Sequence, residues 1–321
     1  MFRNFVVPLD GSEWAERALP YALRLARAGQ GRISLVRVAL APPPMTIDGA
    51  GWERDQREAI DEANHYLADI AEKFAEHVPV ETIVAYGRPV AQILDQVRRL
   101  EADGVVMATH GRTGLVHLLY GSVAETVLAE SGVPVLLVHA RPGQPVAPAF
   151  DPMAGRLVVP LDGSTFAEAA VELAFDFLGP VGELVLVSVI QAPDHVLEDE
   201  RGRVLAYLDQ EVEDRTREAR TYLEEVARRL RLKDPDIHVG VDVQMGEPDA
   251  GIITAATERN ADLIVMATHG RTGLRRITIG SVAGNVLRAG NTPLLLVRPA
   301  MPHQADLPAP EVSVPGSMIV A

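Results

Sequence analysis

The sequence predicts an α/β protein made of two repeated domains, each an open five-stranded parallel sheet with helices on both faces. The first observation is a repeat: Ala102–Val138 matches Ala261–Val297 after a shift of 159 positions, with the same residue at 22 of the 37 positions. The second is a regular alternation of short β-branched runs with longer amphipathic segments. The third is that apolar runs such as VVMA and LLLV carry no polar alternation, as expected for strands buried on both faces.

The elements of the first half can be read in chain order. A strand is expected at Phe5–Leu9, followed by a helix at Glu13–Arg27 and a second strand at Ile33–Val38. A long charged helix is expected at Gly51–His77, before a third strand at Val80–Ala85. Short strands joined through helices run parallel, because right-handed crossovers return each strand in the same direction.

The rest of the half follows the same pattern. The sequence predicts a helix at Pro89–Arg99, a fourth strand at Gly104–Ala108, a helix at Ser122–Glu130 and a last strand at Val133–Val138. The predicted organisation is therefore a first domain over residues 1–142, a linker over 143–154, a second domain over 155–299 and a Pro-rich tail over 300–321.

Composition narrows the possible functions. The net charge of −14 disfavours nucleic acid as a partner, since a phosphodiester backbone is bound by basic groups that replace its counterions. The chain has no cysteine, which excludes disulfides and thiolate metal sites and fits a reducing compartment. No segment approaches the length of a membrane span. We therefore expect a soluble cytoplasmic protein with no membrane partner.

Motifs of common enzymes are missing from the sequence. It contains no G-x4-G-K-[ST] phosphate loop, no H-x3-H metal-ligand spacing and no G-x-S-x-G nucleophile elbow. We assign no catalytic residue and no metal site, and an enzyme is the less favoured interpretation.

Two loops in each half carry the candidate chemistry, because open α/β sheets bind ligands at the carboxyl ends of their strands. Asp10-Gly11-Ser12 follows the first strand, and the same residues recur at Asp162-Gly163-Ser164. A glycine-rich loop follows the fourth strand and opens a helix near Ser122, and its repeat leads to Ser281. The unpaired N–H groups at the start of a helix favour a bound phosphate.

These residues resemble the universal stress protein family, whose nucleotide-binding members carry G-x2-G-x9-G-[ST] after the fourth strand and an Asp after the first. The resemblance covers nearly the whole chain, twice. The motif positions here are Ala108, Gly111, Gly121 and Ser122, then Ala267, Gly270, Gly280 and Ser281. Alanine replaces the first glycine in both halves. The methyl group of alanine crowds a ligand if the loop needs that space, and its Cβ disfavours a positive φ. The replacement is harmless where φ is negative.

The resemblance implies the strand order 3-2-1-4-5 and a site for ATP, with Mg²⁺ brought by the nucleotide. By this resemblance Asp10 and Asp162 bind the adenosine, and the main chains of Val38 and Val189 face the adenine. The phosphates are assigned to Gly111, Gly121, Ser122 and Val123, and to Gly270, Gly280, Ser281 and Val282. The remaining residues expected around the ligands are Pro8, Met107, His110, Arg112, Pro160, Met266, His269 and Arg271, the histidines in a packing role and the arginines as candidate phosphate contacts.

Simpler interpretations stand beside these assignments. Ser122 and Glu125 fit an S-x-x-E capping box that needs no ligand, whereas Ser281 has Gly284 at the matching position. Asp10 and Asp162 can equally be turn residues before a helix.

The preferred function is an adenine-nucleotide-binding sensor or regulator of a stress response. The alternatives are a nucleotide-free scaffold that dimerises, or a slow ATP hydrolase. The apolar last strands, Val133–Val138 and Thr292–Val297, are expected to pair in an intramolecular pseudo-dimer, since unpaired edge strands invite aggregation. A homodimer of the whole chain is plausible.

Overall fold

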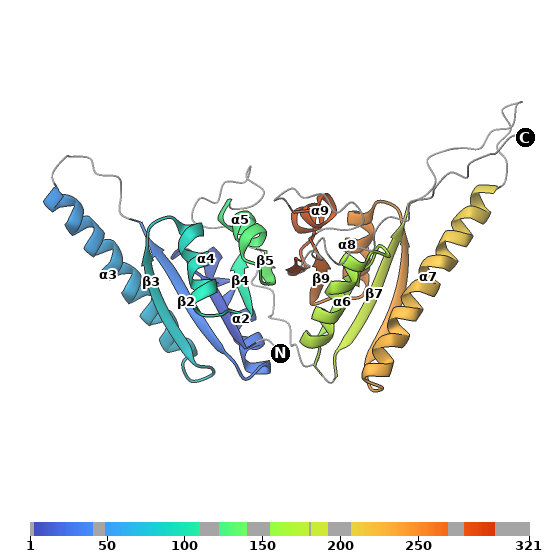
Figure 1. Cartoon of the computed structure of the whole chain (residues 1–321), viewed down its shortest axis with the longest axis horizontal. Coiled ribbons are helices and arrows are strands. Elements are labelled where there is room, and N and C mark those ends of the chain that lie inside the picture. The colour runs from blue at the N-terminus through green and yellow to red at the C-terminus, as the bar shows by residue number, and fades with distance from the viewer. Residues whose placement is uncertain are drawn as a thin grey trace, which may run out of the picture.

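The fold is known from a computed structural model, which describes residues 3–40, 49–109, 122–139, 155–179, 181–191, 207–268 and 279–298. Its two halves lie side by side and share one sheet of ten strands, in the order β3-β2-β1-β4-β5-β10-β9-β6-β7-β8 (Figure 1). Within each half this order is 3-2-1-4-5, in agreement with the order that the family resemblance implies.

The described elements alternate as predicted. The first half contains β1 (Asn4–Pro8), α1 (Glu13–Glu16), α2 (Leu19–Ala28), β2 (Arg32–Ala39), α3 (Gly49–Phe74), β3 (Val80–Tyr86), α4 (Pro89–Arg99), β4 (Gly104–Ala108), α5 (Ser122–Glu130) and β5 (Val135–Val138). The second half contains β6 (Arg156–Pro160), α6 (Thr165–Phe177), β7 (Glu183–Ile190), α7 (Tyr207–Lys233), β8 (His238–Met245), α8 (Pro248–Glu258), β9 (Leu263–Ala267), α9 (Ser281–Ala289) and β10 (Leu294–Val297).

The first helix differs from the prediction. A single helix was expected over Glu13–Arg27, but α1 ends at Glu16 and α2 begins at Leu19. The reason is Pro20, which has no N–H to bond to the carbonyl of Glu16. The second half has Glu172 in place of Pro20, and α6 runs without a break.

The two halves join through their last strands. β5 and β10 are antiparallel, with Leu137 opposite Leu294, Leu136 opposite Leu295 and Val135 opposite Leu296. The other strand pairs of the sheet are parallel. The predicted pairing of the last strands is therefore confirmed, although both strands begin two residues later than expected.

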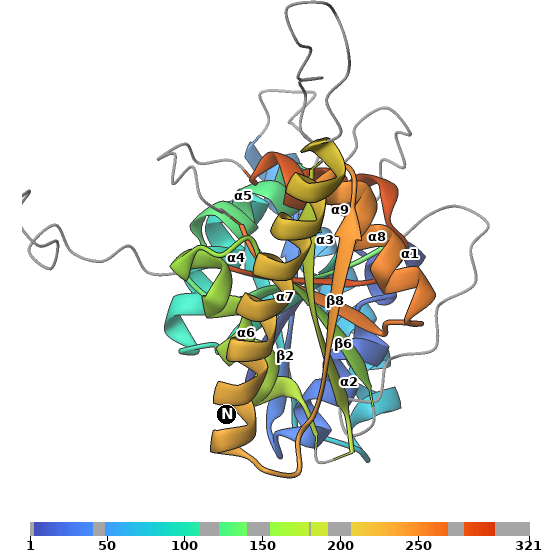
Figure 2. The same ribbon diagram turned by 90° about the vertical axis from the view of Figure 1, so that its right-hand side faces the viewer.

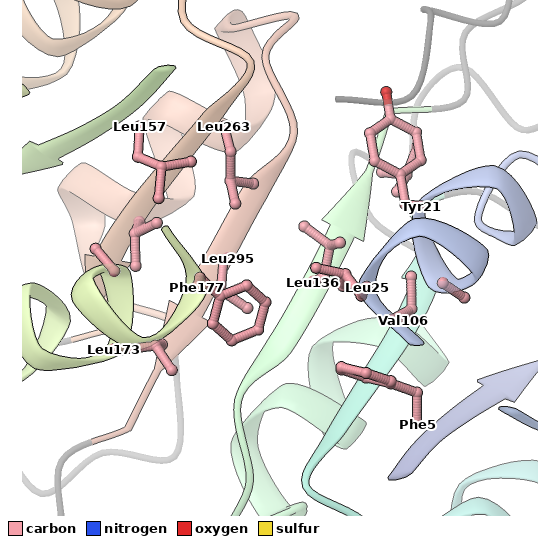
Figure 3. Packing of buried hydrophobic residues seen from close by; sticks show 14 of the residues in the cluster. Phe5, Tyr21, Leu25, Val106, Leu136, Leu157, Leu173, Phe177, Leu263 and Leu295 are labelled. Carbon is pink, nitrogen blue, oxygen red and sulfur yellow. The ribbon is translucent and has the colours of Figure 1, made fainter. Parts of the chain in front are cut away.

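Two apolar layers hold helices against the sheet. Buried residues of α2, α3, α6 and α7 pack on one face, and those of α4, α5, α8 and α9 pack on the other. Figure 3 shows the first layer at the junction, where Leu295 and Phe177 of the second half lie on one side and Leu136 and Leu25 of the first half on the other. Each fully buried leucine contributes about 1.5–3 kcal/mol, so this junction is a packed core and not a surface contact.

The long helices α3 and α7 form the outer flanks of the molecule (Figure 1). Figure 2 shows the molecule from the side of the second half. There α7 lies along β8, and α8 lies on the other side of the strands. The dipeptides Tyr66-Leu67 and Tyr222-Leu223 occupy matching turns of the two helices. None of the described helices is both long and apolar enough to span a membrane.

Candidate functional site

The candidate sites lie where the strand order reverses. In the first half β1 pairs with β2 on one side and with β4 on the other. In the second half β6 lies in the same way between β7 and β9. The chain leaves β1 and β4 toward opposite faces of the sheet. Open α/β sheets are expected to bind ligands in a crevice at such a point, outside the carboxyl ends of the strands. Asp10 follows β1 at this point, and Asp162 follows β6.

The Asp-Gly-Ser turn has the same geometry in both halves. Asp10 Oδ1 accepts hydrogen bonds from Ser12 N at 3.0 Å and from Ser12 Oγ at 2.6 Å. Asp162 Oδ1 accepts the equivalent bonds from Ser164 at the same two distances. Each serine hydroxyl in turn accepts the N–H of the residue three places on, at 3.2 and 3.1 Å, and so caps the helix that follows.

The glycine in this turn is required by the backbone. Gly11 has φ 85° and Gly163 has φ 82°, in the left-handed region that other residues seldom adopt. The turn interpretation of the two aspartates is thus confirmed. It does not exclude a ligand, because an ionised carboxylate can accept about four hydrogen bonds and so can serve more than one partner.

Ala108 and Ala267, which replace the first motif glycine, are ordinary strand residues. Each ends its strand, pairing with Val138 or with Val297, and each is buried. Neither belongs to the non-glycine residues with positive φ. The backbone at these positions therefore accepts a side chain without strain, and the only remaining demand on alanine is the space for one methyl group.

Most of the glycine loop lies outside the described residues. This holds for His110, Gly111, Arg112 and Gly121 in the first half and for His269, Gly270 and Arg271 in the second. At the end of the second loop, Gly280 N donates to the main-chain oxygen of Thr268 at 2.9 Å. This bond brings the start of α9 to the end of β9, so the two ends of the loop are adjacent.

Ser122 and Ser281 begin α5 and α9. Both are exposed, and each is followed by a half-buried valine, Val123 or Val282. The structure begins α5 at Ser122 itself, one position later in the helix than the capping-box interpretation of this serine expects. In the second half the cap is Gly280, which offers no side chain. Both hydroxyls therefore lie at the start of a helix.

The other predicted residues line the ends of the strands. Met107 and Met266 are buried in the penultimate positions of β4 and β9, and Val38 and Val189 are half-buried near the ends of β2 and β7. Pro8 and Pro160 end β1 and β6. The structure brings these residues to the same edge of each half-sheet as the aspartates. No cluster of possible metal ligands occurs among the described residues.

Sequence reasoning missed a buried charge beside the first site. Arg37 in β2 donates from Nη2 to Glu62 Oε1 at 2.8 Å, and its side chain is only 8% exposed. Its guanidinium lies 4.7 Å from the centre of the Tyr66 ring, a cation–π contact. Tyr66 donates its hydroxyl to Glu16 Oε1 at 3.0 Å, which ties α3 to α1.

The second half keeps the tyrosine and changes the cation. Tyr222 donates to Glu168 Oε1 at 3.1 Å, while Arg229 of α7 donates to Glu168 Oε2 at 2.8 Å. Ser188 stands in β7 where β2 has Arg37. Burial, then the carboxylates of Glu16 and Glu168, raises the pKa of both tyrosines above the ordinary value of 10.0. The recurring Tyr-Leu and Ala-Glu dipeptides were the sequence signal for these two links.

The structure is a tandem of two α/β half-sheets joined edge to edge. Each half carries the same Asp-Gly-Ser turn at its point of strand reversal. The model of the universal stress protein family matches residues 1–139 and again residues 153–298. The chain therefore belongs to the universal stress protein family.

Relatives of tandem length and of single-half length both match this chain. Universal stress protein Rv2005c of Mycobacterium tuberculosis is 27% identical over 299 residues, which cover 91% of this chain and 96% of the relative. Universal stress protein MJ0531 of Methanocaldococcus jannaschii is 30% identical over 141 residues, 43% of this chain and 82% of the relative. A universal stress protein structure from Archaeoglobus fulgidus matches with TM-score 0.66 and 24% identity, over 92% of this chain and 96% of that one. The similarity to the Archaeoglobus fulgidus structure shows that the two chains share a fold.

Proposed function

We propose that the chain binds adenine nucleotide at the crevice of each half and acts as a sensor or regulator in a stress response. The observation that carries this proposal is the exact repetition of the Asp-Gly-Ser turn beside a glycine loop at both points of strand reversal. Membership of the universal stress protein family supports the stress-related part of the role.

ATP, with Mg²⁺ carried by the nucleotide, is the proposed ligand. Asp10 and Asp162 would bind the ribose or adenine, and the main chains of Val38 and Val189 would face the base. Ser122 and Ser281 would meet the phosphates, because an exposed hydroxyl and unpaired N–H groups at a helix start favour an anion. The chemistry needed of the protein is binding alone, and we assign no catalytic group.

One observation favours a second function, a nucleotide-free scaffold. Both aspartates already accept two hydrogen bonds within their own turns, so neither needs a ligand to explain its presence. The apolar junction of the halves would serve a scaffold equally well.

The two functions are separated by the small molecules that the purified protein carries. The protein is denatured, and the released compounds are chromatographed against nucleotide standards and quantified per chain. Adenine nucleotide at between one and two molecules per chain supports the sensor. If ligand-stripped protein also fails to take up ATP with Mg²⁺ in calorimetric titration, the scaffold is the better proposal.

A further inference from the structure

A chain of hydrogen bonds crosses the carboxyl end of β7 in the second half. Arg215 of α7 donates from Nη1 to the main-chain oxygen of Gln191, the residue after β7, at 3.3 Å. The Gln191 side chain donates from Nε2 to Glu247 Oε2, also at 3.3 Å. Glu211, one turn before Arg215, holds the guanidinium through Oε1 at 2.6 Å.

This chain joins elements from the two faces of the sheet. Arg215 belongs to α7, which packs on one face, and Glu247 is the N-cap of α8, which packs on the other. Gln191 lies between them, two residues beyond Val189. The three side chains therefore lie across the carboxyl end of β7, from one face of the sheet to the other. They are next to the main chain of Val189, which is proposed to face the adenine.

The first half cannot form the same chain. Aligning β2 with β7 places Leu40 at the position of Gln191, and Leu40 is 59% exposed. Aligning Tyr66 with Tyr222 places Ala59 at the position of Arg215, and the repeated Gly-x-Pro places Arg88 at that of Glu247. Leucine and alanine side chains have no hydrogen-bonding group, and arginine has no acceptor.

We propose that Gln191, Arg215 and Glu247 form a clasp that holds the base end of the second site, so that the two halves release nucleotide at different rates. This inference rests on the proposed nucleotide binding. The clasp residues are positioning residues: they fix the end of β7 and the start of α8 on either side of the base. The aligned residues of the first half provide no such link, whereas in the second half the clasp must open before a ligand leaves past the end of β7.

The test measures the dissociation of radiolabelled ATP with Mg²⁺ from the full chain, chased with unlabelled ATP and followed by rapid filtration. Gly121→Asp leaves the second site to be measured, and Gly280→Asp leaves the first. We expect slower dissociation from the second site.

In the Gly121→Asp background, Gln191→Leu or Arg215→Ala should raise the dissociation rate about two- to five-fold, the effect of losing one or two exposed hydrogen bonds. Arg215→Lys, which keeps a cationic donor, should restore part of the slow release.

Two controls separate the clasp from a general effect on folding. Arg217 lies on the same helix and is paired with Asp214 at 2.7 Å outside the clasp, so Arg217→Ala should leave both rates unchanged. Grafting the clasp into the first half, as Leu40→Gln, Ala59→Arg and Arg88→Glu together, should slow release in the Gly280→Asp background.

The outcomes distinguish this inference from the proposed function. A wild-type chain that binds no ATP overturns the nucleotide site and the clasp with it. ATP binding with equal rates in the two halves, or a second-site rate that Gln191→Leu and Arg215→Ala leave unchanged, overturns the clasp alone.

Discussion

At the scale of single residues, the aspartates after β1 and β6 show how one side chain can satisfy two interpretations. Oδ1 of each accepts two hydrogen bonds from the serine two residues on and so fixes the turn. The same bonds hold the carboxylate at the point of strand reversal, where the proposed nucleotide would meet it. A turn and a ligand contact are therefore compatible, and substitutions must separate them.

We expect Asp10→Ala with Asp162→Ala to abolish most of the rise in melting temperature that ATP with Mg²⁺ produces. A ligand that binds only the folded state stabilises it by about 2.7 kcal/mol per site at a hundredfold excess over Kd. For halves of roughly 150 residues this corresponds to several degrees. The measurement is a thermal melt of ligand-stripped protein with and without ATP.

The paired variants Asp10→Asn and Asp162→Asn test the same residues with the turn preserved, because an Asn side chain also forms this turn. They should fold with wild-type stability in the absence of ligand and still lose the ATP effect. Asp103→Asn is the matched control and should leave the ATP effect unchanged. Asp103 accepts hydrogen bonds from Arg3 N and Asn4 N at the amino end of β1, the end away from the proposed site. An unchanged ATP effect in the Asn pair would leave the aspartates with the turn alone.

At the scale of elements, periodicity predicted the type and order of the described helices and strands and missed details that depend on contacts. The break between α1 and α2 follows from Pro20, a local signal that could have been used. Arg37 could not have been placed from the pattern. A charged residue inside a strand reads as exposed, and only the neighbouring Glu62 and Tyr66 of α3 explain its burial.

The residues of the site divide in the same way. The resemblance assigned positions at the carboxyl ends of the strands, and the described ones among them lie there, because these ends of parallel strands share one side of the sheet. It could not predict the sign of φ at Ala108, the internal bonds of Asp10 or the clasp at Gln191, each of which depends on three-dimensional neighbours.

The tyrosine links between helices predict a dependence of stability on alkaline pH. The folded state raises the pKa of Tyr66 and Tyr222, mainly through burial and then through Glu16 and Glu168. Between the unfolded pKa of about 10 and the higher folded value, the unfolded chain loses a proton that the folded chain keeps, so the free energy of unfolding falls as pH rises above about 10. Below that pH the contribution is complete.

Denaturant unfolding of the wild type and of Tyr66→Phe with Tyr222→Phe, at pH values from 8 to about 11, tests this link. At pH 8 the double variant should be less stable by about 1 kcal/mol for each lost hydrogen bond. Its stability should then fall less steeply than that of the wild type above pH 10. Parallel curves for the two proteins across this range would contradict the assignment.

At the scale of the whole molecule, the junction of β5 with β10 makes one sheet out of two half-sheets. The sequence predicted that the last strands pair, but the register that sets Leu136 opposite Leu295 required the structure. This pairing leaves β3 and β8 as the outer edges of the sheet and places both points of strand reversal in one continuous sheet. The halves should therefore stay together without the covalent link between them.

Cutting the chain tests that expectation. A protease site inserted at the predicted linker, residues 143–154, allows the purified full-length protein to be cleaved and then analysed by size-exclusion chromatography. The two fragments should elute together, because Leu136 and Leu295 are about 1% and 2% exposed and lie in a shared core.

Leu295→Asp should separate the fragments or unfold them, since a carboxylate replaces about 1.5–3 kcal/mol of apolar burial and must itself be desolvated. Leu232→Asp is the control at a leucine that is 71% exposed, and it should change nothing. Separation of the cleaved wild-type fragments at micromolar concentration would mean that the linker, and not the strand pairing, holds the halves together.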